Sequence, residues 1–565
     1  MAEPTGNPAE SSSDFIHQVV RADIQQDTYG GRVQTRFPPE PNGYLHIGHA
    51  KAIVTDFGVA EDFGGTCNLR LDDTNPGTEE TEYVESIIAD IEWLGYSPAH
   101  VVHASDYFEQ LYEWAKYLVR EGLAYVDDQS PETIREQRGG YGKPGIESPY
   151  RNRPAEESLN LLRRMRAGEF PDGSRCPRAR IDLQAENMWL RDPVMYRIRH
   201  QAHHSTGTEW CIYPTYDWAH GQSDAIEGVT HSLCSLEFNS HRPLYDWFLS
   251  HLPLDGPAPK QREFARLELT HTITSKRRLK SLVTNNIVDG WDDPRMPTLR
   301  GMRRRGYPAA AIRAFCQAVG TTKNNSVKAI EEFESFVRRE LNATAQRRMA
   351  VLHPLKLVLD GWPTDDDGNP VVEWFQLVNN PENPDDGTRR VPFTGELWIE
   401  ADDFREDPPR KFFRLSPGHE VRLRGAYLVT ATDVVKNSDG TIAEVHASYD
   451  PQSRGGTAPD GRKVKSTMHW VSAGHAIPVT ANLYDRLFSA EIPGSQTGEA
   501  LDDLNPHSRE TLTEVMAEPA LANVAPGEVV QFERLGYFAA DHDTAVFHRT
   551  VGLRDEWAQL QKRQA

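Results

Sequence analysis

Near the start of the chain, apolar positions change from strand spacing to helix spacing. The run 33–37 is short and partly β-branched, and two prolines stop it because proline cannot continue a sheet ladder or a helix interior. Between 50 and 60 apolar residues recur at helical spacing until Gly64 interrupts them. The pattern predicts a strand, a turn and a helix that begins near Gly48.

The alternation of strand and helix patterns continues over the next sixty residues. Between 67 and 71 every second residue is apolar, which predicts a second strand that ends at Asp72. Amphipathic patterns at 83–94 and 105–122 predict two helices. Strands that alternate with helices in this way predict a parallel sheet and an α/β fold.

The later chain has two further characters. From about 125 to 208 it breaks into loops rich in glycine, proline and arginine, which indicates an insertion before strand and helix patterns resume. Helical spacing between 307 and 341 predicts a small helical unit. Beyond about 347, short strands separated by turn signals such as Asp439-Gly440 predict antiparallel β-barrels.

Length and composition set the class of protein. The chain has 565 residues with 38% hydrophobic and 26% charged residues, which is typical of a globular protein of several domains. No apolar run approaches the roughly 20 residues that span a bilayer, and the polar start lacks a signal core. We therefore expect a cytoplasmic protein whose five cysteines are reduced thiols.

Charge is unevenly distributed along the chain. A net charge of −21 argues against wholesale electrostatic binding of nucleic acid. Two local runs, 276–280 and 295–305, are nevertheless strongly basic. Each run is interpreted equally well as a solvated face or as an RNA contact.

The turn before the first helix has the chemistry of a phosphate site. A helix N-terminus after a strand presents unpaired N–H groups and the positive end of the helix dipole. His46 and His49 can donate hydrogen bonds to phosphate oxygens there, and Gly48 has no side chain to keep a nucleotide away. The alternatives are a zinc site, for which no further ligands lie nearby, or two ordinary polar residues at a helix start.

The second predicted strand ends at a pair of aspartates. Ligands of open α/β sheets bind outside the carboxyl ends of the strands, so Asp72 falls where a substrate ammonium group can be held. The alternative is that Asp72 and Asp73 only signal a turn.

Several motifs in one order resemble those of class I aminoacyl-tRNA synthetases, most closely the glutaminyl-tRNA synthetase family. The resemblance runs from about 32 to 557 and is carried by the segments 38–45, 46–49, 71–76, 274–276 and 290–297. It implies a Rossmann-type catalytic domain with an acceptor-stem insertion and a helical subdomain, followed by two antiparallel β-barrels. The implied divisions are a polar N-terminal tail (1–26), the first half of the catalytic domain (27–104), the insertion (105–215), the second half (216–265), the signature-loop and helical subdomain (266–345) and anticodon-binding barrels (346–565).

The resemblance also implies an ATP site and its catalytic groups. His46, His49 and Lys276 would stabilise charge on the phosphates, and Thr274 stands where the family often has Met. The residues implied to line ATP are Glu40, Pro41, Asn42, His46, Ile47, Gly48, His49, Ala50, Lys51, Ala52, Ser235, Arg266, Leu267, Thr274, Ser275 and Lys276.

The same matching implies a glutamine pocket. Asp72 and Tyr216 would hold the ammonium group and the side-chain amide, and Arg36, Cys234 and Gln261 would complete the pocket. Glutamate-charging relatives tend to carry Arg at the position of Cys234, and a guanidinium group would pair with a carboxylate. The neutral Cys favours glutamine, and a glutamate-charging enzyme of the same architecture is the first alternative.

The implied reaction joins glutamine to tRNA(Gln) in two steps. The glutamine carboxylate attacks the α-phosphate of ATP, with Mg²⁺ sharing the charge, and the tRNA then takes glutamine from the adenylate. Tyr141 would contact the acceptor stem, and Arg347, Arg414 and Arg424 would contact the anticodon. A monomer is expected, and the alternative of a different class is an RNA-binding protein without catalysis.

Overall fold

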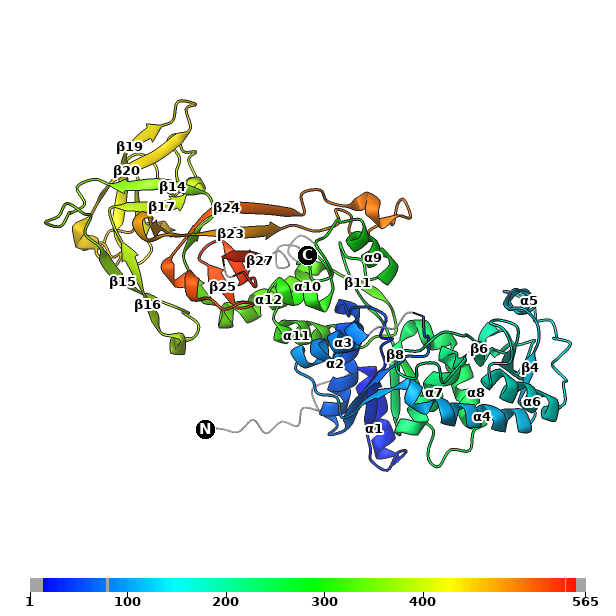
Figure 1. Cartoon of the computed structure of the whole chain (residues 1–565). Helices are drawn as coiled ribbons and strands as arrows, with labels where there is room; N and C mark the ends of the chain where they lie inside the picture. The colour runs from blue at the N-terminus through cyan, green and yellow to red at the C-terminus, as the bar shows by residue number, and fades with distance from the viewer. Residues whose placement is uncertain (1–13, 78–80, 544, 555–565) are drawn as a thin grey trace. The chain divides into compact units, whose positions relative to one another are not determined.

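A computed structural model describes residues 14–77, 81–543 and 545–554 (Figure 1). The chain divides into two compact units. Unit 1 comprises residues 1–268 and 313–327, and unit 2 comprises 269–312 and 328–565.

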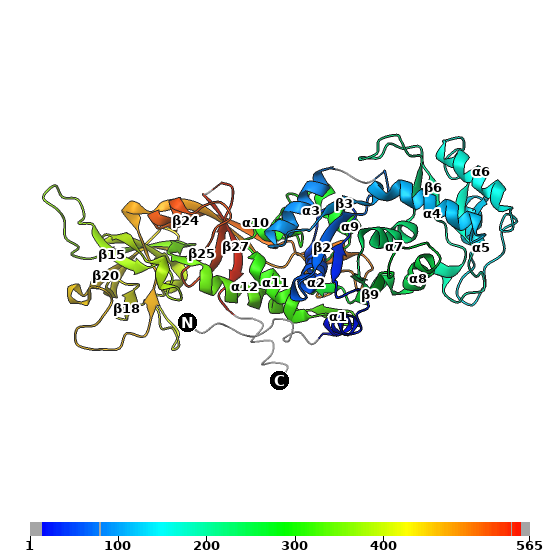
Figure 2. The ribbon, with the colours of Figure 1, turned by 90° about the horizontal axis from the view of Figure 1, so that it is seen from below.

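Unit 1 is built on parallel strands, as the sequence predicts. The order β1-β2-β3 is parallel throughout, β8 pairs with β9 in parallel, and α2 lies against β1 and β2 (Figure 1, Figure 2). The expected Rossmann-type α/β class is confirmed. The elements are β1 (Gln34–Phe37), α2 (Ile47–Asp62), β2 (Thr66–Leu71), α3 (Thr81–Trp93), β3 (Val101–His103), α7 (Tyr216–Glu227), β8 (His231–Ser235), α8 (Arg242–Ser250), β9 (Lys260–Phe264) and β10 (Leu267–Leu269).

The N-terminal segment differs from the expected polar tail. Residues 1–13 lie outside the described residues, but Phe15–Gln25 form helix α1. Ile16 and Val20 are buried in one cluster with Val33 and Leu233. The four-residue spacing of Ile16, Val20 and Ile24 is the amphipathic signal for this helix.

The insertion between β3 and α7 shares a core with the catalytic domain. Its antiparallel pairs β4 with β5 and β6 with β7 pack with α4 and α6, and their apolar cluster includes Trp218 and Phe248 of α7 and α8. The insertion is therefore anchored on the helix that carries Tyr216. Its elements are α4 (Phe108–Arg120), β4 (Ala124–Asp127), α5 (Pro131–Gln137), α6 (Ala155–Arg166), β5 (Cys176–Ala179), β6 (Tyr196–Ile198) and β7 (Ile212–Pro214).

Unit 2 contains helices and two barrel-like seven-stranded sheets. The predicted turn at Asp439-Gly440 joins β19 to β20 in an antiparallel pair, and Gly440 has a φ of 87°. The expected barrels are confirmed, although they are not wholly antiparallel, because strands that are distant in sequence also pair in parallel, for example β14 with β20.

The helices of unit 2 are α9 (Lys276–Thr284), α10 (Leu299–Arg304) and α12 (Ile330–Thr344), and α11 (Ala309–Val319) crosses the division between the units. One seven-stranded sheet contains β14 (Pro354–Leu359), β17 (Glu396–Glu400), β18 (Glu420–Leu423), β19 (Leu428–Lys436), β20 (Ile442–Tyr449), β21 (Thr467–Met468) and β22 (Val471–Ser472). The other contains β12 (Gln346–Arg348), β13 (Ala350–Val351), β23 (Ile477–Tyr484), β24 (Arg509–Ala517), β25 (Val529–Phe532), β26 (Gly536–Ala540) and β27 (Val546–Gly552).

Among the described residues, no helix has both the length and the apolar character that crossing a membrane requires. The five cysteine thiols are free, and Cys67, Cys176 and Cys316 are buried.

Candidate active site

The two histidines of the predicted phosphate turn are locked by the start of α2. His46 is the N-cap residue, and its Nδ1 accepts the Gly48 amide at 3.1 Å. The His46 amide in turn donates to His49 Nδ1 at 3.1 Å. The two rings lie 3.9 Å apart between centroids. This reciprocal cap fixes both side chains against the backbone.

The cap also decides where the imidazole protons reside. Each Nδ1 accepts a backbone N–H, so each neutral ring carries its proton on Nε2. Burial lowers the pKa of His49 to about 4 and lowers the pKa of His46 well below its usual range. Two neutral Nε2–H donors therefore stand at the helix start. Zinc at either Nε2 would require a proton on Nδ1, which already faces an N–H, so the zinc alternative does not fit.

Gly48 is required by this arrangement. A Cβ on Gly48 would lie 2.9 Å from His46 Cε1 and 3.0 Å from His46 Nδ1, so any side chain would push the capping ring away. The same point lies 3.7 Å from the Leu267 carbonyl oxygen, which brings the segment after β9 beside the turn.

The other expected ATP residues of unit 1 differ in exposure. Glu40 is exposed and accepts from Asn42 Nδ2 at 2.5 Å, and Arg266 is exposed and pairs with Glu237 at 3.3 Å. Ser235 Oγ also donates to Glu237, at 2.8 Å. Lys51 is buried, and its ammonium group donates to the Cys316 carbonyl at 2.9 Å. Buried positions comprise Pro41, Ile47, Ala50 and Leu267, whereas Ala52 is half-buried.

Asp72 lies at the end of β2 in a buried ion cluster. Arg70 Nε donates to its carboxylate at 2.9 Å, and Arg70 Nη1 donates to Asp224 at 2.8 Å. Burial opposes ionisation of Asp72, but Arg70 and His220 together outweigh it and lower the pKa of that carboxyl. The Asp72 amide donates to the Pro39 carbonyl at 3.0 Å. This bond joins the carboxylate that is expected to hold the ammonium group to the histidine turn.

Arg36 belongs to the same buried cluster as Asp224. It is fully buried and donates to Asp224 at 3.0 Å, to the Leu233 carbonyl at 2.7 Å and to Ser232 Oγ at 2.6 Å. Its contacts therefore fix β8, which carries Cys234.

The other residues expected in the glutamine pocket present neutral groups. Tyr216 stacks on His220 at 4.8 Å and lies 5.0 Å from the Phe238 ring. Burial raises the pKa of the Tyr216 phenol and of the Cys234 thiol, so both are neutral at pH 7. Gln261 is buried, and its Nε2 donates to the Phe238 carbonyl at 3.1 Å.

Sequence reasoning missed three members of the buried cluster. These are Arg70, His220 and Asp224. His220 Nε2 lies 2.9 Å from Arg36 Nη2, and its Nδ1 lies 3.2 Å from Arg70 Nη2. His220 and Asp224 stand one helical turn apart in α7, a weak sequence signal that gains meaning only when two strands bring arginines to the same face.

Comparisons with known proteins agree over nearly the whole chain. The family model for the catalytic domain of tRNA synthetases class I (E and Q) matches residues 32–343, and the two anticodon-binding models match 345–450 and 467–541. A "Glutamine--tRNA ligase" of Nitrobacter winogradskyi is 55% identical over 557 residues, which cover 98% of each chain. Its namesake in Bradyrhizobium diazoefficiens is 54% identical over 563 residues, 99% of each. The chain belongs to the glutaminyl-tRNA synthetases of class I. The family resemblance inferred from the motifs is confirmed.

The signature segment of this synthetase lies in unit 2. Ser275 is the N-cap residue of α9, Lys276 is the first helical residue, and both are exposed, while Thr274 is half-buried. Ile273 and Leu279 on either side are buried in one cluster with Leu487 and Phe488. The polar signature residues are thus displayed on an apolar base.

Three of the four residues expected to contact tRNA are exposed or about half exposed. Tyr141 is fully exposed in a turn closed by paired backbone hydrogen bonds of 3.1 Å between Gly140 and Lys143. Arg414 and Arg424 are about half exposed and pair with Asp403 at 2.8 Å and with Glu533 at 3.0 Å.

Arg347 is placed differently from the other expected contacts. It is 5% exposed, and its guanidinium donates to the carbonyls of Ala345 and Asn342 at the end of α12. The side chain would have to leave these partners to reach RNA, because the peptide oxygens already occupy its donors.

The basic run 295–305 is mostly paired within unit 2. Arg295 donates to Asp293 at 2.7 Å, and Arg304 donates to Asp541 at 2.8 Å. Arg300 and Arg303 of the same run are exposed, so both interpretations of the run, a solvated face and an RNA contact, stay predictions.

Proposed function

We propose that this synthetase is a glutamine–tRNA ligase whose ATP and glutamine sites meet at the Pro39–Asp72 backbone hydrogen bond. The observation that supports the proposal most directly is the pair of neutral Nε2–H donors at the start of α2, which follows the segment whose Pro39 carbonyl accepts the Asp72 amide. One group of donors faces phosphate, and the carboxylate accepts an ammonium group.

In the first step, Asp72 accepts from the glutamine ammonium group and Tyr216 contacts the side-chain amide. The glutamine carboxylate attacks the α-phosphate of ATP, the bond to the β-phosphate oxygen breaks, and glutaminyl-adenylate and pyrophosphate form. His46 and His49 stabilise the charge that develops on the phosphates, and the positive charge expected from Lys276 of unit 2 stays a prediction. Catalysis is then positioning and electrostatic stabilisation, without a covalent enzyme intermediate.

Mg²⁺ is expected to arrive on the phosphates of ATP, since it keeps several waters and takes few protein ligands. When bound, it shares the phosphate charge with the histidine donors.

In the second step, the 2′-hydroxyl of the terminal adenosine of tRNA(Gln) attacks the adenylate carbonyl and AMP leaves. Tyr141 offers an aromatic face for stacking against an acceptor-stem base. Arg414 and Arg424 are the barrel arginines available to exchange a carboxylate for RNA. Activity as a monomer and a cytoplasmic location stay predictions.

Discrimination against glutamate follows from the neutral wall. The Tyr216 phenol and the Cys234 thiol can each satisfy an amide, whereas a glutamate carboxylate would enter without a cationic partner on that wall. The deciding experiment is aminoacylation of tRNA(Gln) with ATP and either glutamine or glutamate. Faster charging with glutamine is expected; faster charging with glutamate, or none with active tRNA present, would refute the proposal.

A further inference from the structure

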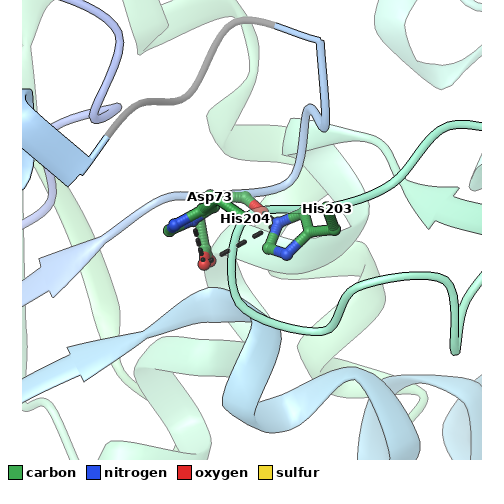
Figure 3. Close-up of side chains that lie close together, drawn as sticks. All are labelled: Asp73, His203 and His204. Atoms are coloured by element: carbon green, nitrogen blue, oxygen red, sulfur yellow. Dashed lines mark hydrogen bonds and ion pairs between the residues drawn. The ribbon is translucent and has the colours of Figure 1, made fainter.

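Asp73, His203 and His204 form a cluster that the reaction described above does not use (Figure 3). One possible ligand atom from each lies within 4.8 Å of the others, and among the described residues this is the one group of three or more with such spacing. Asp73 and His203 are buried. The cluster thus has the spacing of a metal site, and its hydrogen bonds decide whether it is one.

The tautomer of His203 argues against metal binding. Its Nδ1 accepts the amides of Ser205 at 3.2 Å and Thr206 at 3.3 Å, so Nδ1 carries no proton. The ring proton is on Nε2, which donates to the Asp73 carbonyl at 2.6 Å. A cation at Nε2 would leave the ring without any proton. The geometry is that of a directed hydrogen bond to the Asp73 backbone.

The Asp73 carboxylate is held as firmly as its carbonyl. Ser105 donates twice, from its amide at 2.8 Å and from its hydroxyl at 2.7 Å. His204 Nε2 lies 3.0 Å from the same carboxylate. The residue after Asp72 is therefore bound on three sides, while Asp72 itself donates its amide to Pro39.

His203 has a rigid base in the insertion. Its backbone pairs with Gly207 through hydrogen bonds of 2.8 and 2.9 Å, and its ring stacks on Tyr213 at 5.8 Å. Tyr213 belongs to β7, three residues before Tyr216. The segment 203–213 therefore connects Asp73, the neighbour of Asp72, to β7, which leads into Tyr216.

We propose that His203 is a positioning residue that fixes the separation between the two ends of the glutamine pocket, Asp72 and Tyr216. The inference rests on the proposed function, in which these two residues hold the ammonium group and the amide of glutamine. A ligand that is bound at both ends binds well only if the distance between the two binding residues matches the length of the ligand. Loosening Asp73 would weaken glutamine binding in the ground state and transition state alike, which raises the KM for glutamine and leaves kcat nearly unchanged.

Two substitutions of His203 test the role of the Nε2–H donor apart from the role of the Nδ1 acceptor. His203→Asn keeps an acceptor near Nδ1 for the Ser205 and Thr206 amides but places no donor near the Asp73 carbonyl. His203→Gln carries an amide N–H near the position of Nε2. We expect His203→Asn to raise the KM for glutamine about tenfold, as befits a lost buried hydrogen bond, with the KM for ATP and kcat nearly unchanged. His203→Gln should recover most of that loss.

The matched control is His200→Asn in the same segment. His200 is 44% exposed in its side chain and pairs with the exposed Asp172, so the substitution should leave all three constants unchanged. If His203→Asn lowers the melting temperature and shifts the constants for ATP and glutamine together, the residue is merely structural and the proposal is overturned. Equal constants for His203→Asn and the unmodified chain overturn it as well.

Asp72→Asn distinguishes this proposal from the function on which it rests. If Asp72→Asn leaves the KM for glutamine unchanged, the assignment of the pocket fails. If it raises that KM and His203→Asn does not, only the positioning role fails. Should His203→Asn not fold, Ser105→Ala removes one donor to Asp73, and a rise in the KM for glutamine of about threefold is expected from a weaker hydrogen bond; no rise overturns the proposal.

Discussion

The buried cluster beside Asp72 in unit 1 and the partly exposed arginines of the barrels in unit 2 both contain arginine–carboxylate pairs, in opposite settings. Arg36, Arg70 and Asp224 have no exposed side-chain surface and share several hydrogen bonds. The side chains of Arg414 and Arg424 are 44% and 50% exposed. Buried pairs lose much when one partner is removed, whereas exposed pairs contribute little and exchange readily. The buried pairs are suited to holding the proposed glutamine pocket in one geometry. The exposed arginines are suited to a surface on which RNA phosphates can replace their carboxylate partners.

The largest expected effect comes from breaking the buried set. Asp224→Asn leaves two buried guanidinium groups without their shared charge, so the free energy of unfolding should fall by about 3 to 5 kcal/mol in urea denaturation. The control is Glu396→Gln, which removes the carboxylate from an ion pair with Lys356 whose Glu side chain is 53% exposed. An equal loss in the two variants would remove the distinction between the regions.

The histidine donors are also fixed, and their loss should appear in the rate of chemistry. His46→Ala or His49→Ala should each slow adenylate formation about 10² to 10³-fold, measured as pyrophosphate exchange with tRNA present, while tRNA affinity stays nearly intact. His46→Asn is the sharper variant, because its amide oxygen can still cap α2 and restore stability without the Nε2–H donor. Undiminished activity would favour the alternative of an RNA-binding protein without catalysis.

The same two rings predict a pH dependence of stability with a definite sign. Their pKa values in the folded chain lie below the usual 6.5, with His49 at about 4, so the unfolded chain takes up protons first as the pH falls. The contribution of these neutral rings to the free energy of unfolding is fully present above pH 6.5 and is lost as the pH falls toward 4. We expect His49 alone to account for a loss of about 2 kcal/mol between pH 7 and pH 5, with a further loss from His46 and a smaller total loss in His49→Ala. Adenylate formation should show no step at pH 6.5; a step there would mean that the rings titrate normally.

The smallest effects on stability are expected at the exposed arginines. Arg424→Gln should change the free energy of unfolding by less than about 1 kcal/mol, while the KM for tRNA rises and its dependence on salt weakens. Arg347→Gln should leave the KM for tRNA nearly unchanged. It should lower the free energy of unfolding by about 1 to 3 kcal/mol, because carbonyls at the end of α12 are left unpaired. A large effect of Arg347→Gln on tRNA binding with unchanged stability would mean that this side chain leaves its partners for RNA.

How far the sequence predicts each region depends on how local its interactions are. The strand, turn and helix around His46, and the end of β2 at Asp72, follow from spacing within about twenty residues, and the structure places them as expected. The spacing of residues does not predict that Tyr216, Cys234 and Gln261 belong to one pocket; only the motif resemblance implies it.

Other features depend on contacts between distant segments. Arg36 and Asp224 are separated by 188 residues, and only the folded sheet brings them together. The exposure of Arg347 and Arg424 could not be distinguished either, because both lie on β-rich segments and their neighbours in space decide whether a guanidinium finds peptide oxygens or solvent. Helix α1 was missed for a different reason, since a short amphipathic repeat inside a polar start resembles a tail until its apolar stripe meets Val33 and Leu233.

The hydrogen bond from the Asp72 amide to the Pro39 carbonyl has a practical consequence for inhibitor chemistry. In the proposed function, the segment around Pro39 leads to the phosphate donors and β2 ends at Asp72, and this main-chain hydrogen bond holds the two segments together. A compound that links an amino-acid portion to a nucleoside portion through a stable bridge would have to match a single backbone conformation, and the length of the bridge becomes its most exacting design parameter.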